Sequence, residues 1–116
     1  MDELLTADYI DHDPGGRSSD REGFKEGIKR LYNAFPDFYA SVEDITWDEE
    51  KNMAAVRWSG RGTHSAEYLG YPATGKMIRF KGIELIEIKN DLISQRWGEW
   101  DGIEILEQIK NYSKPY

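Results

Sequence analysis

The chain has 116 residues, 39% of them hydrophobic and 32% charged, which suits one packed domain and argues against disorder. Its formal net charge of −7 at pH 7 argues against binding to nucleic acid or to an anionic membrane surface, since both require a basic footprint. Because there is no cysteine, disulfides, thiolate catalysis and cysteine-based metal sites are excluded.

The first residues of the chain are predicted to be helical. They lack the basic stretch and apolar core of a signal peptide, and no apolar run approaches the roughly 20 residues that span a bilayer, so we expect a cytoplasmic protein. Leu4, Leu5 and Ile10 are the apolar members of a short helical pattern over residues 2–10. The Pro-Gly-Gly of residues 14–16 ends this pattern.

A second, amphipathic helix is predicted to end before Pro36. Residues 18–20 offer serine and aspartate as N-caps, and acidic residues follow near the helix start. One apolar face follows from the spacings of four, three and four residues between Phe24, Ile28, Leu31 and Phe35.

Between residues 38 and 100 the pattern favours strands. Residues 38–47, 53–64, 77–89 and 92–100 are predicted to form four antiparallel strands, joined by a polar turn, a loop over residues 65–76 and a tight Asn90-Asp91 turn. Gly60 and Gly62 inside the second strand predict a bulge or a sharp bend. A final helix runs from about Gly102 to Lys110.

This order of elements predicts an α+β fold. We expect a cone-shaped, curved antiparallel sheet of about four strands, packed against N-terminal helices and followed by a short C-terminal helix. A curved sheet closed by helices leaves a concave space, and the four Trp, seven Tyr and four Phe suit an apolar lining for it. A small hydrophobic ligand is the expected occupant.

The end of the last strand carries the most suggestive polar residues. Trp97, Glu99 and Asp101 share one face if the strand is regular, which would place carboxylates beside an indole. A carboxylate in an aromatic pocket has a raised pKa and suits general acid–base catalysis. Alternatively, Asp101 caps the helix that starts at Gly102, and Glu99 faces solvent.

Several other polar and aromatic residues could have either a structural or a functional role. Trp58, Trp97 and Trp100 either build the core or line the cavity. His64 either reaches the pocket mouth or is a structural histidine, and His12 either caps backbone carbonyls or faces the pocket. Glu84 is expected to pair with Arg57, Arg79 or Arg96 inside the cone. The two histidines share no ligand spacing, so no metal site is predicted.

Nine short motifs, in order and over nearly the whole chain, resemble the SnoaL-like polyketide cyclases of the nuclear-transport-factor-2-like superfamily. They are Tyr9-Ile10-Asp11-His12-Asp13-Pro14, Ala34-Phe35-Pro36-Asp37, Val42-Glu43-Asp44, Val56-Arg57-Trp58, Gly62-Thr63-His64, Gly70-Tyr71-Pro72-Ala73-Thr74-Gly75-Lys76, Gly82-Ile83-Glu84, Trp97-Gly98-Glu99-Trp100-Asp101 and Ile105-Leu106-Glu107-Gln108-Ile109.

The resemblance implies a single domain over residues 1–116, a homodimer with sheets packed face to face, and no cofactor. In the cyclases an Asp of a Trp-x-x-x-Asp motif is the general acid–base of an intramolecular aldol closure, and that motif falls on Trp97 and Asp101. Asp101 would then be the proton shuttle, with His64 and His12 orienting a hydrophobic carbonyl compound. A non-catalytic ligand-binding or dimerisation domain is the competing hypothesis.

Two features depart from the family pattern. Only about eight residues precede Tyr9, which implies a shortened N-terminal helix and either a truncated lid or a lid supplied by a partner chain. Arg96 stands where the family commonly has His. If this position lines the pocket, Arg96 favours an anionic ligand or a buried pair with Glu84 or Glu99.

Overall fold

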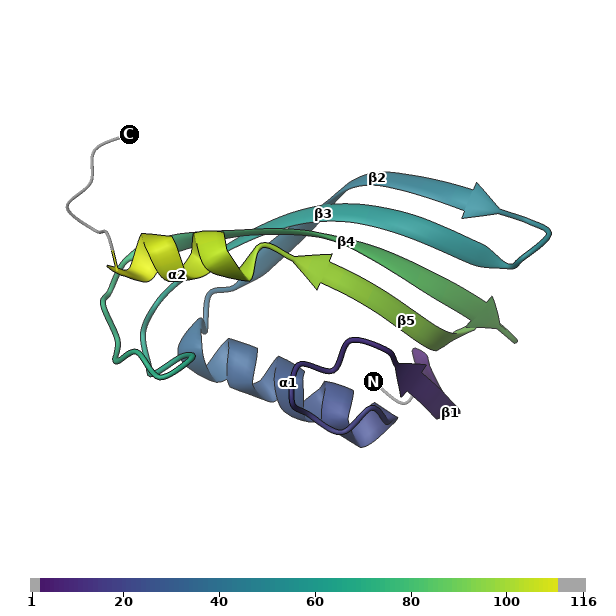
Figure 1. Cartoon of the computed structure of the whole chain (residues 1–116), viewed down its shortest axis with the longest axis horizontal. Coiled ribbons are helices and arrows are strands. Elements are labelled where there is room, and N and C mark those ends of the chain that lie inside the picture. Colours follow the sequence, from purple (N-terminus) through teal and green to yellow (C-terminus); the bar gives the residue numbers. More distant parts are fainter. Residues whose placement is uncertain (1–2, 111–116) are drawn as a thin grey trace.

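Residues 3–110 are described by a computed structural model, in which a curved five-stranded sheet arches over one helix and carries a second helix at its edge (Figure 1). The strands run in the order β1-β5-β4-β3-β2, with β2 to β5 antiparallel and β1 parallel to β5. The α+β class and the four predicted antiparallel strands are thereby confirmed. The elements are β1 (Leu5–Asp11), α1 (Arg21–Ala34), β2 (Tyr39–Asp48), β3 (Met53–Thr63), β4 (Met77–Lys89), β5 (Leu92–Trp100) and α2 (Gly102–Lys110).

The predicted helix over residues 2–10 is wrong: Leu5–Asp11 form β1, while Asp2 lies outside the described residues. The backbone of this segment pairs with the edge of β5, through Ile93 N donating to Leu4 O (2.8 Å) and His12 N donating to Arg96 O (2.9 Å). Without this pairing, the β5 edge would be left with unpaired backbone groups. Tertiary pairing therefore overrides a weak local helical pattern.

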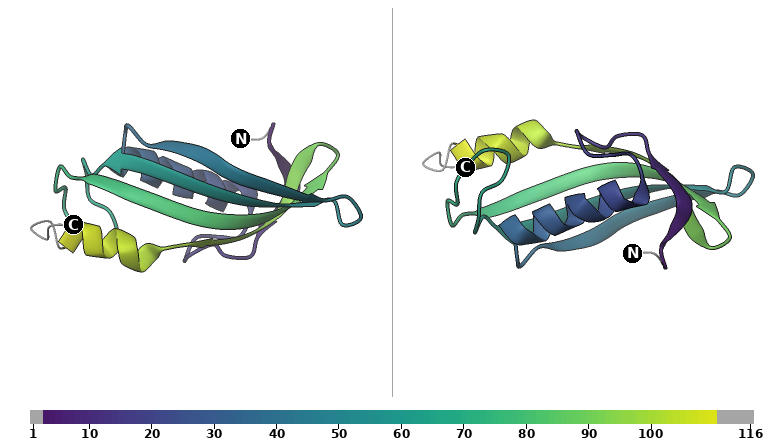
Figure 2. Two further views of the ribbon diagram at one scale, coloured as in Figure 1. Left: turned by 90° about the horizontal axis from the view of Figure 1, so that it is seen from above. Right: turned by 90° about the horizontal axis from the view of Figure 1, so that it is seen from below.

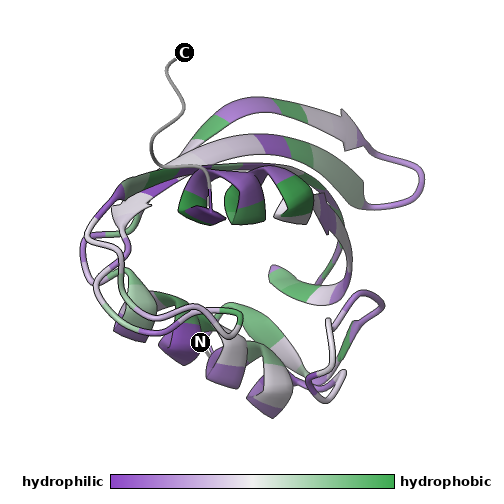
Figure 3. Ribbon diagram, turned by 60° about the vertical axis from the view of Figure 1, so that its left-hand side comes forward, coloured by the Kyte–Doolittle hydropathy of each residue, from purple (hydrophilic) through white to green (hydrophobic). Residues whose placement is uncertain are grey.

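Helix α1 has the predicted position and crosses the concave face of the sheet (Figures 2 and 3). Asp20 is its N-cap and accepts a hydrogen bond from Gly23 N at 2.9 Å. The helix ends at Ala34, where the amide of Phe35 still bonds to Leu31 O at 2.8 Å before Pro36 stops the turn. Neither helix among the described residues is long and apolar enough to cross a membrane.

Gly60 and Gly62 do not form the predicted bulge. The register between β3 and β4 is unbroken, and the irregularity lies instead in β2, between Val42 and Asp44. The glycines allow the chain after α1 to approach the sheet: a Cβ at Gly62 would lie 2.9 Å from Phe35 Cβ, and one at Gly60 would lie 3.0 Å from Phe38 Cζ.

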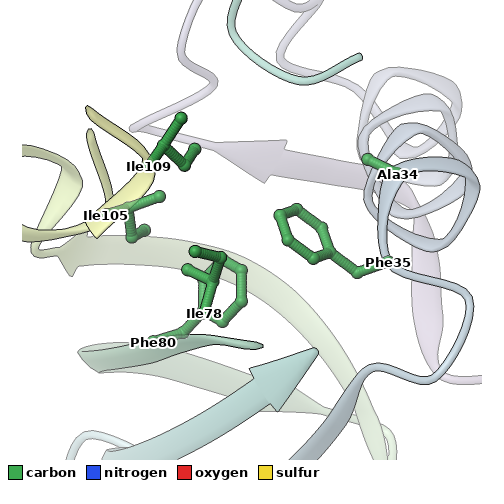
Figure 4. Close-up of a cluster of buried hydrophobic side chains, with 6 residues drawn as sticks. All are labelled: Ala34, Phe35, Ile78, Phe80, Ile105 and Ile109. Atoms are coloured by element: carbon green, nitrogen blue, oxygen red, sulfur yellow. The ribbon is translucent and has the colours of Figure 1, made fainter. Parts of the chain in front are cut away.

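The buried core lies between the sheet, the end of α1 and α2. Phe35 packs edge-to-face on Phe80 at 5.0 Å between ring centroids, and Ile78 lies on the same side of β4. Helix α2 lies against β4 where that strand extends beyond β5. There Gln108 bonds both backbone groups of Arg79, at 2.7 and 2.8 Å, as a neighbouring strand would. The core residues drawn in Figure 4 are Ala34, Phe35, Ile78, Phe80, Ile105 and Ile109.

The pairing register decides which face of the sheet each residue occupies, because directly opposed residues share a face. We call the face that packs on α1 the inner face and the opposite one the outer face. On the inner face, Gly82 of β4 lies directly opposite Trp58 of β3 and Trp100 of β5. Phe80 and Glu84 are each two residues from Gly82 along β4, so their side chains share this face. Arg57, Ile83 and Glu99 are opposed on the outer face, as are Leu85 and Trp97.

Candidate functional site

The inner face carries a group of four charged side chains, which we call the inner charge cluster: Asp11, Arg17, Glu84 and Arg96. The Asp11 side chain is fully buried. Its Oδ1 accepts bonds from Arg96 Nη1 and from the amide of Asp13, both at 2.9 Å, and its Oδ2 lies 3.3 Å from Arg17 Nη2. Strand β1, absent from the sequence-based prediction, is what brings this carboxylate to β5.

Glu84 is the most exposed member of the cluster and pairs with Arg96. Arg96 Nε donates to Glu84 Oε1 at 3.0 Å, and Nη2 forms an ion pair with the same oxygen at 2.9 Å, so Oε2 has no hydrogen-bond partner within residues 3–110. The Glu84 side chain is 28% exposed and that of Arg96 17%. Burial opposes the charge of Arg96, but the carboxylates of Glu84 and Asp11 outweigh it and raise the pKa of the guanidinium. Arg96 therefore pairs with Glu84, one of the partners expected for it, and the pair is half-buried.

Tyr9 and Phe24 complete the surroundings of the cluster. Tyr9 is 2% exposed, and its hydroxyl has no hydrogen-bond partner among the described residues. Burial raises the pKa of Tyr9, and the Asp11 carboxylate raises it further, so the phenol stays protonated. The ring packs on Phe24 of α1 at 5.8 Å, and the guanidiniums of Arg17 and Arg96 lie 5.9 and 5.8 Å from the Phe24 centroid.

Next to the cluster, the inner face is aromatic and open to solvent. Trp58 is half-buried, and a Cβ at Gly82 would lie 2.8 Å from its Nε1, so the indole lies over that glycine. Trp100 stacks on Phe80 at 6.1 Å and is 43% exposed. Trp58 and Trp100 thus lie on the same face as Glu84.

Asp101 is a helix cap. It is exposed, and its Oδ1 accepts a hydrogen bond from the amide of Glu104 at 2.9 Å, in the first turn of α2. This is the alternative geometry expected for it. No contact joins Asp101 to the inner charge cluster within residues 3–110, so the geometry gives no support to a catalytic role.

His64 is a core residue at the other end of α1. It is fully buried, its Nδ1 lies 2.9 Å from Thr74 Oγ1, and its ring stacks on Phe35 at 5.5 Å. Arg17, by contrast, bonds Gly23 O at the start of α1. The 14 residues of α1 separate these two ends by about 21 Å. His64 therefore cannot act on the same small substrate as the inner charge cluster.

His12, Trp97 and Glu99 belong to the outer side of the sheet. The imidazole of His12 stacks on Trp97 at 4.4 Å and 2°. Its Nε2 lies 2.8 Å from Gln95 Oε1, and Gln95 Nε2 donates to Glu87 at 3.0 Å. The carboxylate fixes the orientation of the Gln95 amide, so His12 Nε2 is the donor. The sheet thus separates His12 and Trp97 from Glu84.

Sequence reasoning missed Asp11, Arg17 and Tyr9 as site residues. Asp11 and Tyr9 were assigned to a helix and its end, so their common face on a strand was not considered. Their separation by one residue was the available signal, since a period of two places both on the same side of a strand. Within residues 3–110, no three His, Asp or Glu side chains are grouped so that they could hold a metal ion.

Comparison with known proteins places this site in a family. A family model described as SnoaL-like polyketide cyclase matches residues 1–109. Wild-type IdmH from Streptomyces antibioticus, described as a candidate polyketide cyclase, is 28% identical with a TM-score of 0.80, covering 94% of this chain and 84% of that one. A further candidate polyketide cyclase, from Acidithiobacillus ferrooxidans, is 25% identical with a TM-score of 0.80, covering 95% and 80%.

More distant structures share the fold. TsrD from Streptomyces laurentii is 23% identical with a TM-score of 0.80, covering 93% of this chain and 78% of that one. No curated protein is similar enough to this chain to count as a match.

Proposed function

This chain belongs to the SnoaL-like polyketide cyclase family, and we propose that it binds a small, largely apolar carbonyl compound on the inner face of the sheet and moves a proton on it without a cofactor. The observation that carries this proposal is the Glu84–Arg96 pair, in which one carboxylate oxygen remains free beside a charged guanidinium.

The pair combines a base with a group that stabilises negative charge. Glu84 Oε2 takes a proton from the carbon next to the carbonyl, and the electrons of that C–H bond move onto the carbonyl oxygen. Arg96 donates its Nε–H to Glu84 and one Nη1–H to Asp11, and its other N–H groups stabilise the developing oxyanion. Because Arg96 is already held by two carboxylates, little reorganisation is needed.

The enolate can react in two ways, and in each of them Glu84 gives back the proton that it removed. In an isomerisation, Glu84 returns the same proton to another carbon of the conjugated system. In a cyclisation, the enolate carbon attacks a second carbonyl of the substrate, and the resulting alkoxide takes the proton from Glu84. The exposed indole of Trp100 and the half-buried one of Trp58 contact the apolar part of the substrate and exclude water.

The sharpest test measures proton removal itself. A simple β-keto ester is incubated with the protein in D2O, and exchange of the α-proton is followed by NMR. We expect Glu84→Gln to lose most of the protein-dependent exchange. Glu99→Gln is the matched control, because it removes a carboxylate from the neighbouring strand on the opposite face. Equal exchange with Glu84→Gln and the unmodified protein would show that Glu84 is not the base.

The second candidate function is a non-catalytic ligand-binding or dimerisation domain. It is favoured by the capping role of Asp101 and by the exposed apolar side chains on the outer face, where Ile83 is 56% and Leu85 40% exposed. On this reading the chain forms a homodimer through its outer faces. Light scattering would measure the mass in solution, and Leu85→Glu should convert a dimer of this kind to monomers.

A further inference from the structure

We propose that the outer face of the sheet, at the end next to α2, binds a small organic anion: a carboxylate that carries an apolar group. The site is an open groove of about 640 Å³, which we call the outer groove. This volume falls within the range of ordinary small-ligand sites. Its principal lining residues are Tyr39, Ser59, Arg61, Met77, Arg79 and Lys81.

The groove contains a pair of like charges. Arg61 of β3 lies directly opposite Arg79 of β4, so the two side chains project from the same face of the sheet. Both residues are exposed. Neither forms an ion pair within residues 3–110. Like charges directly opposed across strands destabilise a sheet unless an anion lies between them. In a chain with 22 acidic and 15 basic residues, such a pair is not a consequence of excess positive charge.

No carboxylate forms an ion pair with either arginine within residues 3–110, although Arg61 lies close enough to Asp37 to lower the pKa of that carboxyl. Asp37 uses both oxygens on Thr63, at 2.7 Å to the amide and 2.7 Å to the hydroxyl. Glu104 of α2 lies 3.3 Å from Lys81 Nζ. The lining residues themselves include three cations and one carboxylate, and a further carboxylate, Glu43, accepts a hydrogen bond from the lining residue Ser59. Arg57, the next arginine on the outer face, differs because Asp44 accepts its Nε at 2.8 Å.

The structure around the two arginines is well fixed. The Gln108 side chain bonds both backbone groups of Arg79, at 2.7 and 2.8 Å, and anchors that strand to α2. Arg61 pairs with Tyr39 on one side and Arg79 on the other. Two adjacent guanidiniums on a fixed backbone suit a carboxylate, which accepts parallel hydrogen bonds.

The groove also offers apolar surface beside the charges. Tyr39 is 64% exposed and Met77 54% exposed, and both line the groove. An aryl or alkyl group attached to the carboxylate would cover these side chains, which a bare inorganic anion cannot do. The groove is on the opposite face from Glu84, so it is independent of the proposed reaction.

The test uses benzoate and inorganic phosphate as probes, with isothermal titration and thermal melts at constant ionic strength. We expect benzoate to bind more tightly than phosphate and to raise Tm. Arg61→Gln and Arg79→Gln should each weaken benzoate binding by about ten-fold or more, through the loss of a charge-assisted hydrogen bond. Each should also raise Tm without ligand, because the repulsion is relieved. Arg57→Gln is the matched control and should leave benzoate affinity unchanged.

Three results would overturn the proposal. The first is the absence of benzoate binding, and the second is an equal loss of affinity with Arg57→Gln. The third is a change in the mass measured by light scattering when Arg61 or Arg79 is replaced, because a second copy of the chain would then occupy the groove. Phosphate binding as tightly as benzoate would remove the apolar part of the proposal and leave a site for inorganic anions.

Discussion

Glu84 and Arg96 face each other across neighbouring strands, and the Nε hydrogen bond at 3.0 Å and the Nη2 ion-pair contact at 2.9 Å end on the same carboxylate oxygen. The pair is anchored from behind by Asp11, whose buried carboxylate accepts from Arg96 Nη1 at 2.9 Å. Arg96 is thus held between two carboxylates. The proposed chemistry depends on this arrangement, because it fixes the guanidinium while leaving Glu84 Oε2 free.

Asp11→Asn should strongly destabilise the protein. Its carboxylate is buried and contacts both Arg17 and Arg96, so the substitution leaves two cations with less compensation. Breaking a buried pair in this way costs about 3–5 kcal/mol. Urea unfolding followed by tryptophan fluorescence would measure it. Asp8→Asn, on the exposed side of β1, is the control and should change stability by no more than about 0.5 kcal/mol.

Two substitutions at Asp101 separate capping from catalysis. Asp101→Ala should destabilise the protein by about 1 kcal/mol, because the hydrogen bond to the amide of Glu104 is lost. Asp101→Asn should keep both stability and α-proton exchange, since asparagine is an equally good N-cap. A stable Asp101→Asn variant without exchange activity would instead identify Asp101 as the base.

Acid should destabilise the protein through carboxylates that accept hydrogen bonds. The amide of Thr63, and then its hydroxyl, lowers the pKa of Asp37, and Ser94 and then Gln95 lower the pKa of Glu87. A carboxyl group whose pKa is lower in the folded state than in the unfolded state stabilises the protein fully at pH values above its unfolded-state pKa, which is about 4. This contribution is lost as the pH falls through the folded values.

The expected Tm is therefore level above about pH 5 and falls below about pH 4. Thermal melts across this range would measure it. Asp37→Asn should make the acid-side decrease shallower. An unchanged slope in this variant would show that the hydrogen bonds to Thr63 do not contribute.

Gly62→Ala should destabilise the protein through crowding. The new Cβ would lie 2.9 Å from Phe35 Cβ, which is fixed by the core, and overpacking of this kind costs about 1–3 kcal/mol. Gly102→Ala is the matched control. It adds the same methyl group at the start of α2, where nothing lies within 4 Å, and should be neutral or slightly stabilising. Chemical denaturation of both variants gives the comparison, and equal losses at the two positions would contradict the crowding argument.

Periodicity alone was sufficient for α1 and for the four antiparallel strands. The recurrence of Phe24, Ile28, Leu31 and Phe35, bounded by an Asp20 cap and Pro36, indicates a local helix that the structure confirms. The tight turn at Asn90 and Asp91 is equally local, since both residues adopt positive φ angles of 53° and 65°. These features depend on interactions within a few residues, so a single sequence contains the information.

Strand β1 and the composition of the site depended on tertiary structure. Residues 5–11 pair with β5, some 85 residues later, and no local pattern indicates that partner. The face occupied by Glu84 could not be assigned before the register was known, because a shift of one residue exchanges the two faces of a strand. The same register separates Trp97 and Glu99 from Arg96, and α1 separates His64 from Asp11.

The sequence by itself thus determined the α+β class, the positions of α1, α2 and the antiparallel strands, and a set of polar and aromatic candidates. Only the tertiary structure determines which of these candidate residues contact one another. It joined Asp11 and Arg96 across parallel strands and assigned Asp101 to a helix cap. The physical reason is that helices and turns arise from short-range backbone and side-chain contacts, whereas a site on a sheet requires a pairing register set by contacts between distant segments.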